Sequence, residues 1–156
     1  MSNDSSIRLE LDTDLAGLAV LEETVNQILA PVTDLQDAEA VHYNIWLSIH
    51  ELCVNIIKHA YGGGPGTIQA TFALEDDGRT LVMQTHDYGA HKFAFDAWAP
   101  PDLSDPPIHG LGIFLIRQLM DEVEYVVEPD GSRWRLVKHL VRAANPAVPV
   151  STEVTP

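Results

Sequence analysis

ELCVNIIKHAY, residues 51–61, ends the longest helical pattern of the chain, which runs from about residue 35 to residue 61. Apolar residues recur along this pattern at the spacing of one helix face: Ile45, Ile49, Leu52, Ile56 and Ala60. The glycine-rich stretch GGGPG at 62–66 stops it. We therefore expect a long helix that buries one face and ends in a loop.

The same helix carries a second, polar stripe, formed by Asn44, Ser48, Glu51, Asn55 and Lys58. Its members are three or four positions apart, so they share a face, and Glu51 lies one turn from Asn55. Such a stripe can simply be the solvated side of an amphipathic helix. It can also be a binding site, because the Asn carbonyl oxygen suits a hard cation such as Mg²⁺. Spacing alone leaves both interpretations open.

The patterns on either side predict the remaining elements and the fold class. In chain order they are a strand at 6–11, a helix at 15–30 behind a Thr13/Asp14 cap, strands at 67–75 and 79–86 joined by a turn at Asp76-Asp77-Gly78, a loop at 88–109, a helix at 110–120, and strands at 123–128 and 132–140. This order predicts an α+β fold, a two-layer α/β sandwich with a mixed, mostly antiparallel sheet and helices on one face. We expect a single domain over residues 1–141 and a disordered tail over 142–156.

Composition excludes several classes of partner. The 156 residues include 9 basic and 23 acidic side chains, a formal net charge of −14. A chain with so few cations lacks the basic face needed to bind nucleic acid or an anionic membrane, so we expect neither partner. The single cysteine excludes an intrachain disulfide. Without a signal-peptide pattern or a run of about 18 apolar residues, the sequence predicts a cytoplasmic protein.

His86-Asp87-Tyr88-Gly89 lies where a predicted strand ends and the long loop begins. Asp87 can cap a turn there, with Gly89 taking a positive φ. Alternatively, a buried Asp87 carboxylate can accept a hydrogen bond from an exocyclic amine such as that of adenine, while Gly89 lets the backbone approach a flat ring. The residues alone do not decide between the two.

Gly110-Leu111-Gly112 directly precedes an apolar helix. Glycines at a helix entrance leave backbone N–H groups free, and the helix dipole adds positive charge, so phosphate is a natural ligand. An ordinary loop closure explains an isolated GxG equally well. The combination of a Mg²⁺-type ligand, an adenine-type carboxylate and phosphate-type glycines favours a nucleotide site. The histidines outside residues 51–61 show no HxxxH or HxH spacing, so we expect no transition-metal site.

These three stretches resemble, in order and spacing, the three nucleotide-binding boxes of the GHKL ATPase superfamily, whose fold is the Bergerat or histidine kinase-like ATPase fold. LGIFLI at 111–116, followed by LMDEV at 119–123, closely resembles the RsbW-type and SpoIIAB-type anti-sigma factors, which are serine kinases. The resemblance covers roughly residues 9–140, and the Met-Asp-Glu-Val ending is its most specific part.

The resemblance implies a role for each matching residue. Glu51 is the general base that takes the proton of a protein serine, and Asn55 binds the Mg²⁺ that bridges the ATP phosphates. Asp87 binds the adenine amino group, and Gly89 admits the ring. The other implied nucleotide-binding residues are Lys58, His109, Gly110, Leu111 and Gly112, and residues 88–109 form an ATP lid.

The chain departs from the superfamily pattern at several positions. His91 stands where a glycine is common, and Ile108 and His109 stand where small residues are common. A threonine that often faces adenine aligns with Arg133. We expect these changes to affect the rate of phosphorylation more than the fold.

The resemblance implies a partner-switching kinase that uses ATP and Mg²⁺, with ATP or ADP setting partner affinity. It would bind a sigma factor or another target in one state and phosphorylate a STAS-domain anti-anti-sigma antagonist in the other, and it would form a homodimer. One alternative is a non-catalytic nucleotide-sensing adaptor. Another is the ATP-binding half of a two-component histidine kinase, which is disfavoured because the chain shows no helical hairpin carrying a phosphoacceptor histidine.

Overall fold

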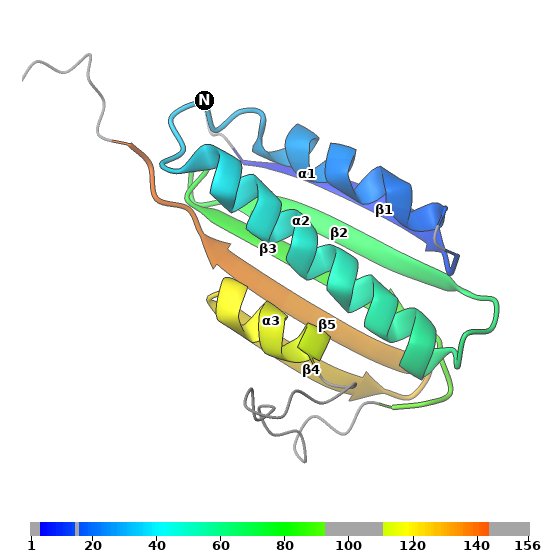
Figure 1. The fold of residues 1–156 in the computed structure, drawn as a ribbon. Helices are drawn as coiled ribbons and strands as arrows, with labels where there is room; N and C mark the ends of the chain where they lie inside the picture. The colour runs from blue at the N-terminus through cyan, green and yellow to red at the C-terminus, as the bar shows by residue number, and fades with distance from the viewer. Residues whose placement is uncertain (1–3, 15, 93–110, 144–156) are drawn as a thin grey trace, which may run out of the picture.

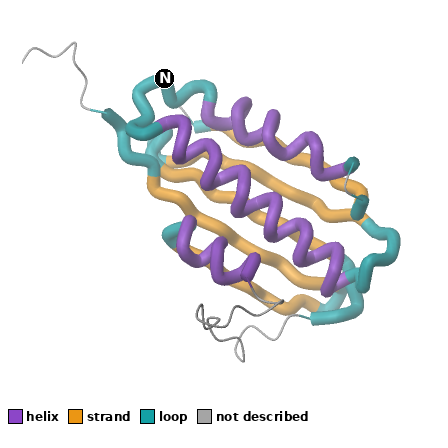
Figure 2. Tube along the Cα trace, in the orientation of Figure 1, coloured by secondary structure: helices purple, strands orange, loops and turns teal. Residues whose placement is uncertain are grey.

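The computed structural model describes residues 4–14, 16–92 and 111–143, which form two layers (Figure 1). One layer is a sheet of strands β1 (Ser5–Asp12), β2 (Thr67–Glu75), β3 (Thr80–Asp87), β4 (Glu122–Glu128) and β5 (Gly131–His139). The other consists of helices α1 (Val20–Leu29), α2 (Ala38–Asn55) and α3 (Leu111–Leu119), which lie across one face of the sheet (Figure 2). A 3-10 turn, η1 (Gly17–Ala19), precedes α1, and a π-helical segment, η2 (Ile56–Ala60), follows α2.

The strand order is β1-β2-β3-β5-β4, and each of the four pairings is antiparallel. The predicted α+β sandwich is confirmed, although the described part of the sheet contains no parallel pair. After α3 the chain enters β4 at the edge and returns through β5, which lies between β4 and β3. This insertion places the start of β5 beside the end of β3, with Ser132 opposite Asp87.

The core lies between the sheet and the helices. Alternate residues of β2 and β3 are buried against the helix layer, as the period of two predicts, and Phe72 and Met83 are fully covered. The predicted apolar stripe of α2 is confirmed, with Ile45, Ile49 and Leu52 also fully buried. Each such side chain contributes about 1.5–3 kcal/mol through its burial. This packing holds α2 along the centre of the sheet.

The first two helices begin later than the sequence patterns predict. The Asp14 carboxylate accepts a hydrogen bond from the Gly17 N–H, and the 3-10 turn η1 occupies residues 17–19, so α1 starts only at Val20. The Thr13 hydroxyl caps nothing here, because it donates to the Gly64 carbonyl oxygen. Helix α2 starts at Ala38 because Asp37 is left-handed, with a φ of 52°. These boundaries depend on local backbone geometry that side-chain periodicity does not encode.

The end of the long helix also differs from a regular α-helix. Its last turn widens into η2, where the Tyr61 N–H donates to the Ile56 carbonyl oxygen, five residues back. Wide turns of this kind are rare and often occur at functional sites. The widened turn covers residues 56–60 and so lies inside the 51–61 stretch at the end of the long helical pattern.

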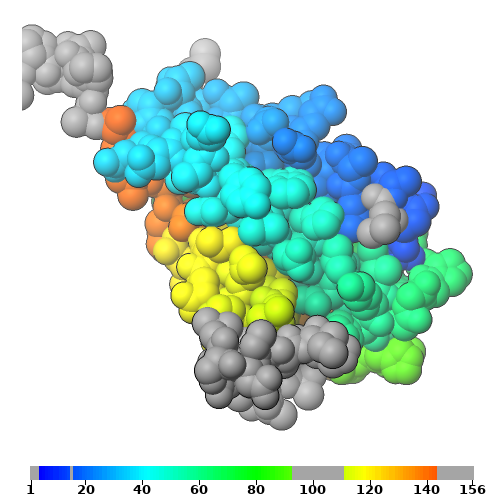
Figure 3. Space-filling model, in the orientation of Figure 1, coloured from blue at the N-terminus to red at the C-terminus, as the bar shows by residue number. Residues whose placement is uncertain are grey.

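Helix α2 lies between α1 and α3, and the three form one continuous surface (Figure 3). Beyond β5 the chain stays attached through residue 143, since Arg142 forms an ion pair with Asp34 and the Ala143 N–H donates to the Asp34 carbonyl oxygen. Residues 144–156 lie outside the described residues, so the tail stays a prediction. In the described ranges, no helix has the length and apolar character needed to cross a membrane.

Candidate functional site

Glu51 and Asn55 of α2 meet the first turn of α3 at Gly112. A Cβ atom placed on Gly112 would lie 2.9 Å from Asn55 Nδ2 and 3.2 Å from Glu51 Oε2. The two polar side chains therefore occupy the space that a side chain at position 112 would need. The packing of α2 against α3 thus brings together three residues that the sequence had placed in two separate boxes.

The polar stripe of α2 is not simply a solvated helix side. Ser48 is completely buried, and its hydroxyl donates to the Asn44 carbonyl oxygen at 2.8 Å. Glu51 and Asn55 are half-buried beside α3, and Lys58 is the one exposed residue of the stripe. Asn55 Nδ2 is buried and has no hydrogen-bond partner among the described residues. An amide NH₂ group left without a partner in this way is available to an acceptor atom of a ligand, such as a phosphate oxygen.

Asp87, the last residue of β3, is 1% exposed. Its Oδ1 accepts a hydrogen bond from the Gly89 N–H at 3.0 Å, whereas its buried Oδ2 has no partner in the described part of the chain. Burial raises the pKa of Asp87 above its ordinary value, and the Gly89 hydrogen bond and the positive charges of Lys92 and His86 act in the opposite direction. Asp87 therefore caps a turn with one oxygen and leaves the other for an outside donor.

Gly89 is required by a close backbone approach. A Cβ atom at this position would lie 2.3 Å from the Ala60 carbonyl oxygen of η2. Its φ is not positive, so that part of the turn interpretation is wrong. The His91 N–H donates to the same Ala60 oxygen at 3.3 Å. The contact fastens the chain leaving β3 to the widened turn of the long helix.

Tyr61 strengthens this attachment, in a role that no sequence pattern indicated. Its hydroxyl accepts a hydrogen bond from the Tyr88 N–H at 2.8 Å and donates to the Thr67 carbonyl oxygen at 2.5 Å. One side chain thus links the end of the long helix to both the start of β2 and the exit of β3. We regard Tyr61 as a positioning residue for Asp87.

Ser132 is a second site residue that the sequence reading missed. It lies opposite Asp87, is 2% exposed, and its Oγ lies 2.9 Å from the Tyr125 hydroxyl. Arg133, which we expected in place of the adenine-facing threonine, is exposed on the opposite face, where its Nε donates to Glu128 Oε1. A shift of one residue along a strand exchanges its two faces. Trp134 and Leu136 lie two and four positions after Ser132 and are buried on the same face of β5. This apolar alternation is the signal that could have placed Ser132, and not Arg133, on the inner face.

Asn55, Asp87 and Ser132 line one small cavity, with Ile56, Ile113 and Trp134 among its apolar walls. Its volume is about 20 Å³, which is room for about one water molecule. The cavity is therefore too small for a nucleotide base, and its walls would have to move apart to admit one. Residues 93–110 lie outside the described residues. They include His109 and Gly110, two of the predicted site residues, and most of the predicted loop.

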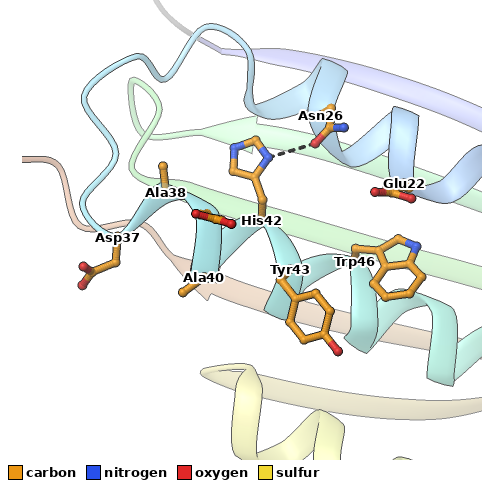
Figure 4. Close-up of a pocket in the computed structure, with 9 residues that line it drawn as sticks. Glu22, Asn26, Asp37, Ala38, Ala40, His42, Tyr43 and Trp46 are labelled. Atoms are coloured by element: carbon orange, nitrogen blue, oxygen red, sulfur yellow. Dashed lines mark hydrogen bonds between the residues drawn. The ribbon is translucent and has the colours of Figure 1, made fainter.

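A far larger groove lies between α1 and the N-terminal half of α2 (Figure 4). Its volume is about 1020 Å³, and its described lining includes Glu22, Asp37 and Glu39 but no lysine or arginine. Three carboxylates repel a triphosphate, so this groove does not suit a nucleotide although it is the larger of the two cavities. The groove also presents Tyr43 and Trp46, whose rings lie 5.8 Å apart.

Residues 13–138 match the family model described as histidine kinase-like ATPase domain. The chain belongs to this family. Its relatives within the histidine kinase-like ATPases include the serine-protein kinase RsbW of Bacillus cereus strain B4264, at 32% identity, and that of Bacillus thuringiensis subsp. konkukian strain 97-27, at 33% identity. In both cases the match spans 116 residues, 68% of this chain and 70% of the relative. The resemblance to RsbW-type proteins is therefore confirmed.

A solved structure supports the fold independently. The crystal structure of the RsbU and RsbW domains of a Mycobacterium tuberculosis protein superposes with a TM-score of 0.61 at 17% sequence identity. The match covers 90% of this chain and 35% of that one, so the chain spans about a third of its length. At this identity the likeness shows the architecture alone.

Proposed function

We propose that this protein is an ATP-dependent serine kinase and anti-sigma factor of a partner-switching module. The observation that carries the proposal is the convergence of Glu51 and Asn55 on Gly112, together with the buried Asp87 oxygen that has no donor among the described residues. The RsbW relatives supply the reaction class, since they are named serine-protein kinases. Its substrate would be the serine of a STAS-domain anti-anti-sigma factor, and its other partner a sigma factor or another target.

The polar atoms fit ATP and Mg²⁺. Asp87 Oδ2 would accept a hydrogen bond from the adenine amino group, and the Asn55 carbonyl oxygen would hold the ion. The N-terminal end of α3, at Leu111 and Gly112, would direct its N–H groups at the phosphates. When bound, Mg²⁺ neutralises phosphate charge. We propose that Lys58, Gly89, His109 and Gly110 complete the nucleotide site.

Glu51 is the proposed general base. A carboxylate can take the proton of an attacking serine hydroxyl as the new O–P bond forms and ADP leaves. Glu51 lies at the α2–α3 contact, one helical turn from Asn55, which suits a group acting beside the phosphates. It is half-buried, so it is held in place and still accessible to a docked protein.

One observation favours a second candidate function, a nucleotide-sensing adaptor that does not transfer phosphate. The cavity at Asp87 and Asn55 is closed to about 20 Å³, and a site that opens slowly would bind nucleotide without rapid turnover. Incubation with γ-labelled ATP and a cognate STAS-domain protein separates the two functions. Labelled serine supports the kinase, and nucleotide binding without label supports the adaptor.

Replacing Asp87 by asparagine is expected to weaken ATP binding about ten- to hundredfold, the loss expected for a hydrogen bond to a charged group. An asparagine amide has one acceptor oxygen. If that oxygen accepts the Gly89 N–H, the asparagine NH₂ group faces the adenine amino group, and both groups are donors. In the reverse orientation the oxygen faces adenine, but the NH₂ group then faces the Gly89 N–H, which is also a donor. Calorimetric titration with ATP measures the loss, and Asp76→Asn in the exposed β2–β3 turn is the control. Unchanged affinity in Asp87→Asn would contradict the assignment.

The same substitution should stabilise the nucleotide-free protein at neutral pH. The unfolded chain releases the Asp87 proton near the ordinary pKa of 3.8, whereas the folded chain holds it to higher pH because its pKa is raised. The stability of the native sequence therefore falls as the pH rises through the interval between these two pKa values, and the loss is complete above the folded value. Asparagine removes this fall. Urea denaturation at several pH values should show a gain that grows from acid to neutral pH.

Exchange of ADP for ATP is expected to change partner preference. A coupling free energy of about 1–3 kcal/mol changes relative affinity about 5- to 150-fold. Pull-down from native cytosol with ATP and then ADP would identify the proteins that exchange, and sedimentation would measure the proposed homodimer. If the same proteins are retained equally in both nucleotides, the switching part of the proposal is wrong.

A further inference from the structure

Three side chains from separate segments meet on the sheet face away from the helices. They are His86 of β3, Glu128 at the end of β4 and Asp130 in the β4–β5 turn, and one potential ligand atom from each lies within 4.8 Å of the others. Although His86 adjoins Asp87, strand alternation directs the two side chains to opposite faces. The group is therefore separate from the nucleotide site.

The distances in this group are too long for hydrogen bonds. His86 Nε2 lies 3.7 Å from Glu128 Oε2 and 3.5 Å from Asp130 Oδ1, whereas N···O hydrogen bonds measure about 2.7–3.2 Å. The Nε2 atom is buried and has no hydrogen-bond partner among the described residues. Ligand atoms about 2.0–2.1 Å from a tetrahedral ion lie roughly 3.4 Å from one another. The two distances to His86 Nε2 are close to that value, and all three ligand atoms lie within 4.8 Å of one another.

Neighbouring contacts orient the group. The Arg133 Nε donates to Glu128 Oε1 at 2.9 Å, which leaves Oε2 on the side of His86. The His86 ring packs against Tyr88, with ring centroids 4.5 Å apart. Such supporting contacts fix the rings and carboxylates that bind metals. An imidazole that binds a metal is neutral, so the two carboxylates of the group outweigh the single guanidinium.

We propose that His86, Glu128 and Asp130 bind a divalent transition-metal ion, with Zn²⁺ as the expected ion. One imidazole nitrogen and two carboxylate oxygens suit Zn²⁺, and the exposed side at Asp130 leaves room for a water as the fourth ligand. Mg²⁺ is disfavoured because it prefers six oxygen ligands. The ion would join the end of β3 to the β4–β5 turn. Histidine spacing could not reveal this group, because it contains one histidine, which lies far in the sequence from the two carboxylates.

Calorimetric titration of the chelator-treated full chain with ZnCl₂, without nucleotide, tests the proposal. We expect one saturable site whose affinity falls at least about tenfold in His86→Ala and in Asp130→Asn. Asp130 is mostly exposed, so its substitution should leave folding intact, as circular dichroism would verify. The matched control is His139→Ala, because exposed His139 also lies near a carboxylate, Glu122, at 4.0 Å.

Three results would overturn the metal site: no saturable Zn²⁺ binding, native affinity in both His86→Ala and Asp130→Asn, or an equal loss in His139→Ala. Thermal melting gives a second measurement, because an ion that binds only the folded chain raises its melting temperature. Zn²⁺ should raise it in the native sequence and not in Asp130→Asn. Since no ATP is present in either experiment, a negative result leaves the kinase proposal unaffected.

Discussion

Replacing Glu51 by glutamine is expected to lower the rate constant of serine phosphorylation by about 10²- to 10⁴-fold while ATP affinity stays near that of the native sequence. Glutamine has nearly the same shape, so it can keep the contact with α3 at Gly112, but its amide cannot take a proton at neutral pH. Label transfer from γ-labelled ATP to a STAS-domain protein measures the rate. Calorimetry measures nucleotide affinity.

Glu39→Gln is the matched control for this experiment. Glu39 lies in the first turn of the same helix and is exposed, so its loss removes a favourable helix-dipole interaction of about 0.3–1 kcal/mol and nothing at the site. We expect this variant to phosphorylate at the native rate. Rapid phosphorylation by Glu51→Gln would exclude Glu51 as the base. If the native protein binds ATP but labels no STAS-domain protein, the adaptor is the better description.

The sequence was sufficient for the fold class because its signals are periodic and local. Alternation in β2 and the apolar stripe of α2 each identified the face that the structure buries. It also named the residues that meet at the α2–α3 contact, although only as members of separate boxes. That Glu51, Asn55 and Gly112 touch is a consequence of helix packing, which no spacing along one segment can show.

The errors came from features that depend on backbone geometry or on strand register. The left-handed Asp37 delays α2, and the approach of Gly89 to Ala60 replaces the positive φ that a turn would need. Placing Arg133 at the adenine position required a register accurate to one residue, and Ser132 is the side chain that faces inward. The proposed metal-binding group at His86 also depends on strand pairing, because its residues come from β3, β4 and the β4–β5 turn.

Gly131→Ala is expected to cause the largest loss of stability, about 3 kcal/mol or more, because backbone must move to make room. A Cβ atom at Gly131 would lie 1.7 Å from the Asp87 carbonyl oxygen and 3.1 Å from the Tyr88 Cα. Both atoms belong to the main chain, so no change of side-chain rotamer relieves the overlap. The start of β5 has to separate from the end of β3. Urea denaturation measures the loss.

Gly63→Ala separates this steric effect from the ordinary cost of replacing glycine. Gly63 has a φ of 80°, and a Cβ atom there would have no neighbour within 4 Å, so its substitution should cost only about 1–2 kcal/mol of backbone strain. A loss in Gly131→Ala no greater than this would show that the strands accommodate the methyl group. Because the displaced backbone carries Asp87, the folded fraction of Gly131→Ala should also bind ATP more weakly, whereas Gly63→Ala should bind it normally. Stability and nucleotide affinity would then fall together for one reason, the shared contact between Gly131 and Asp87.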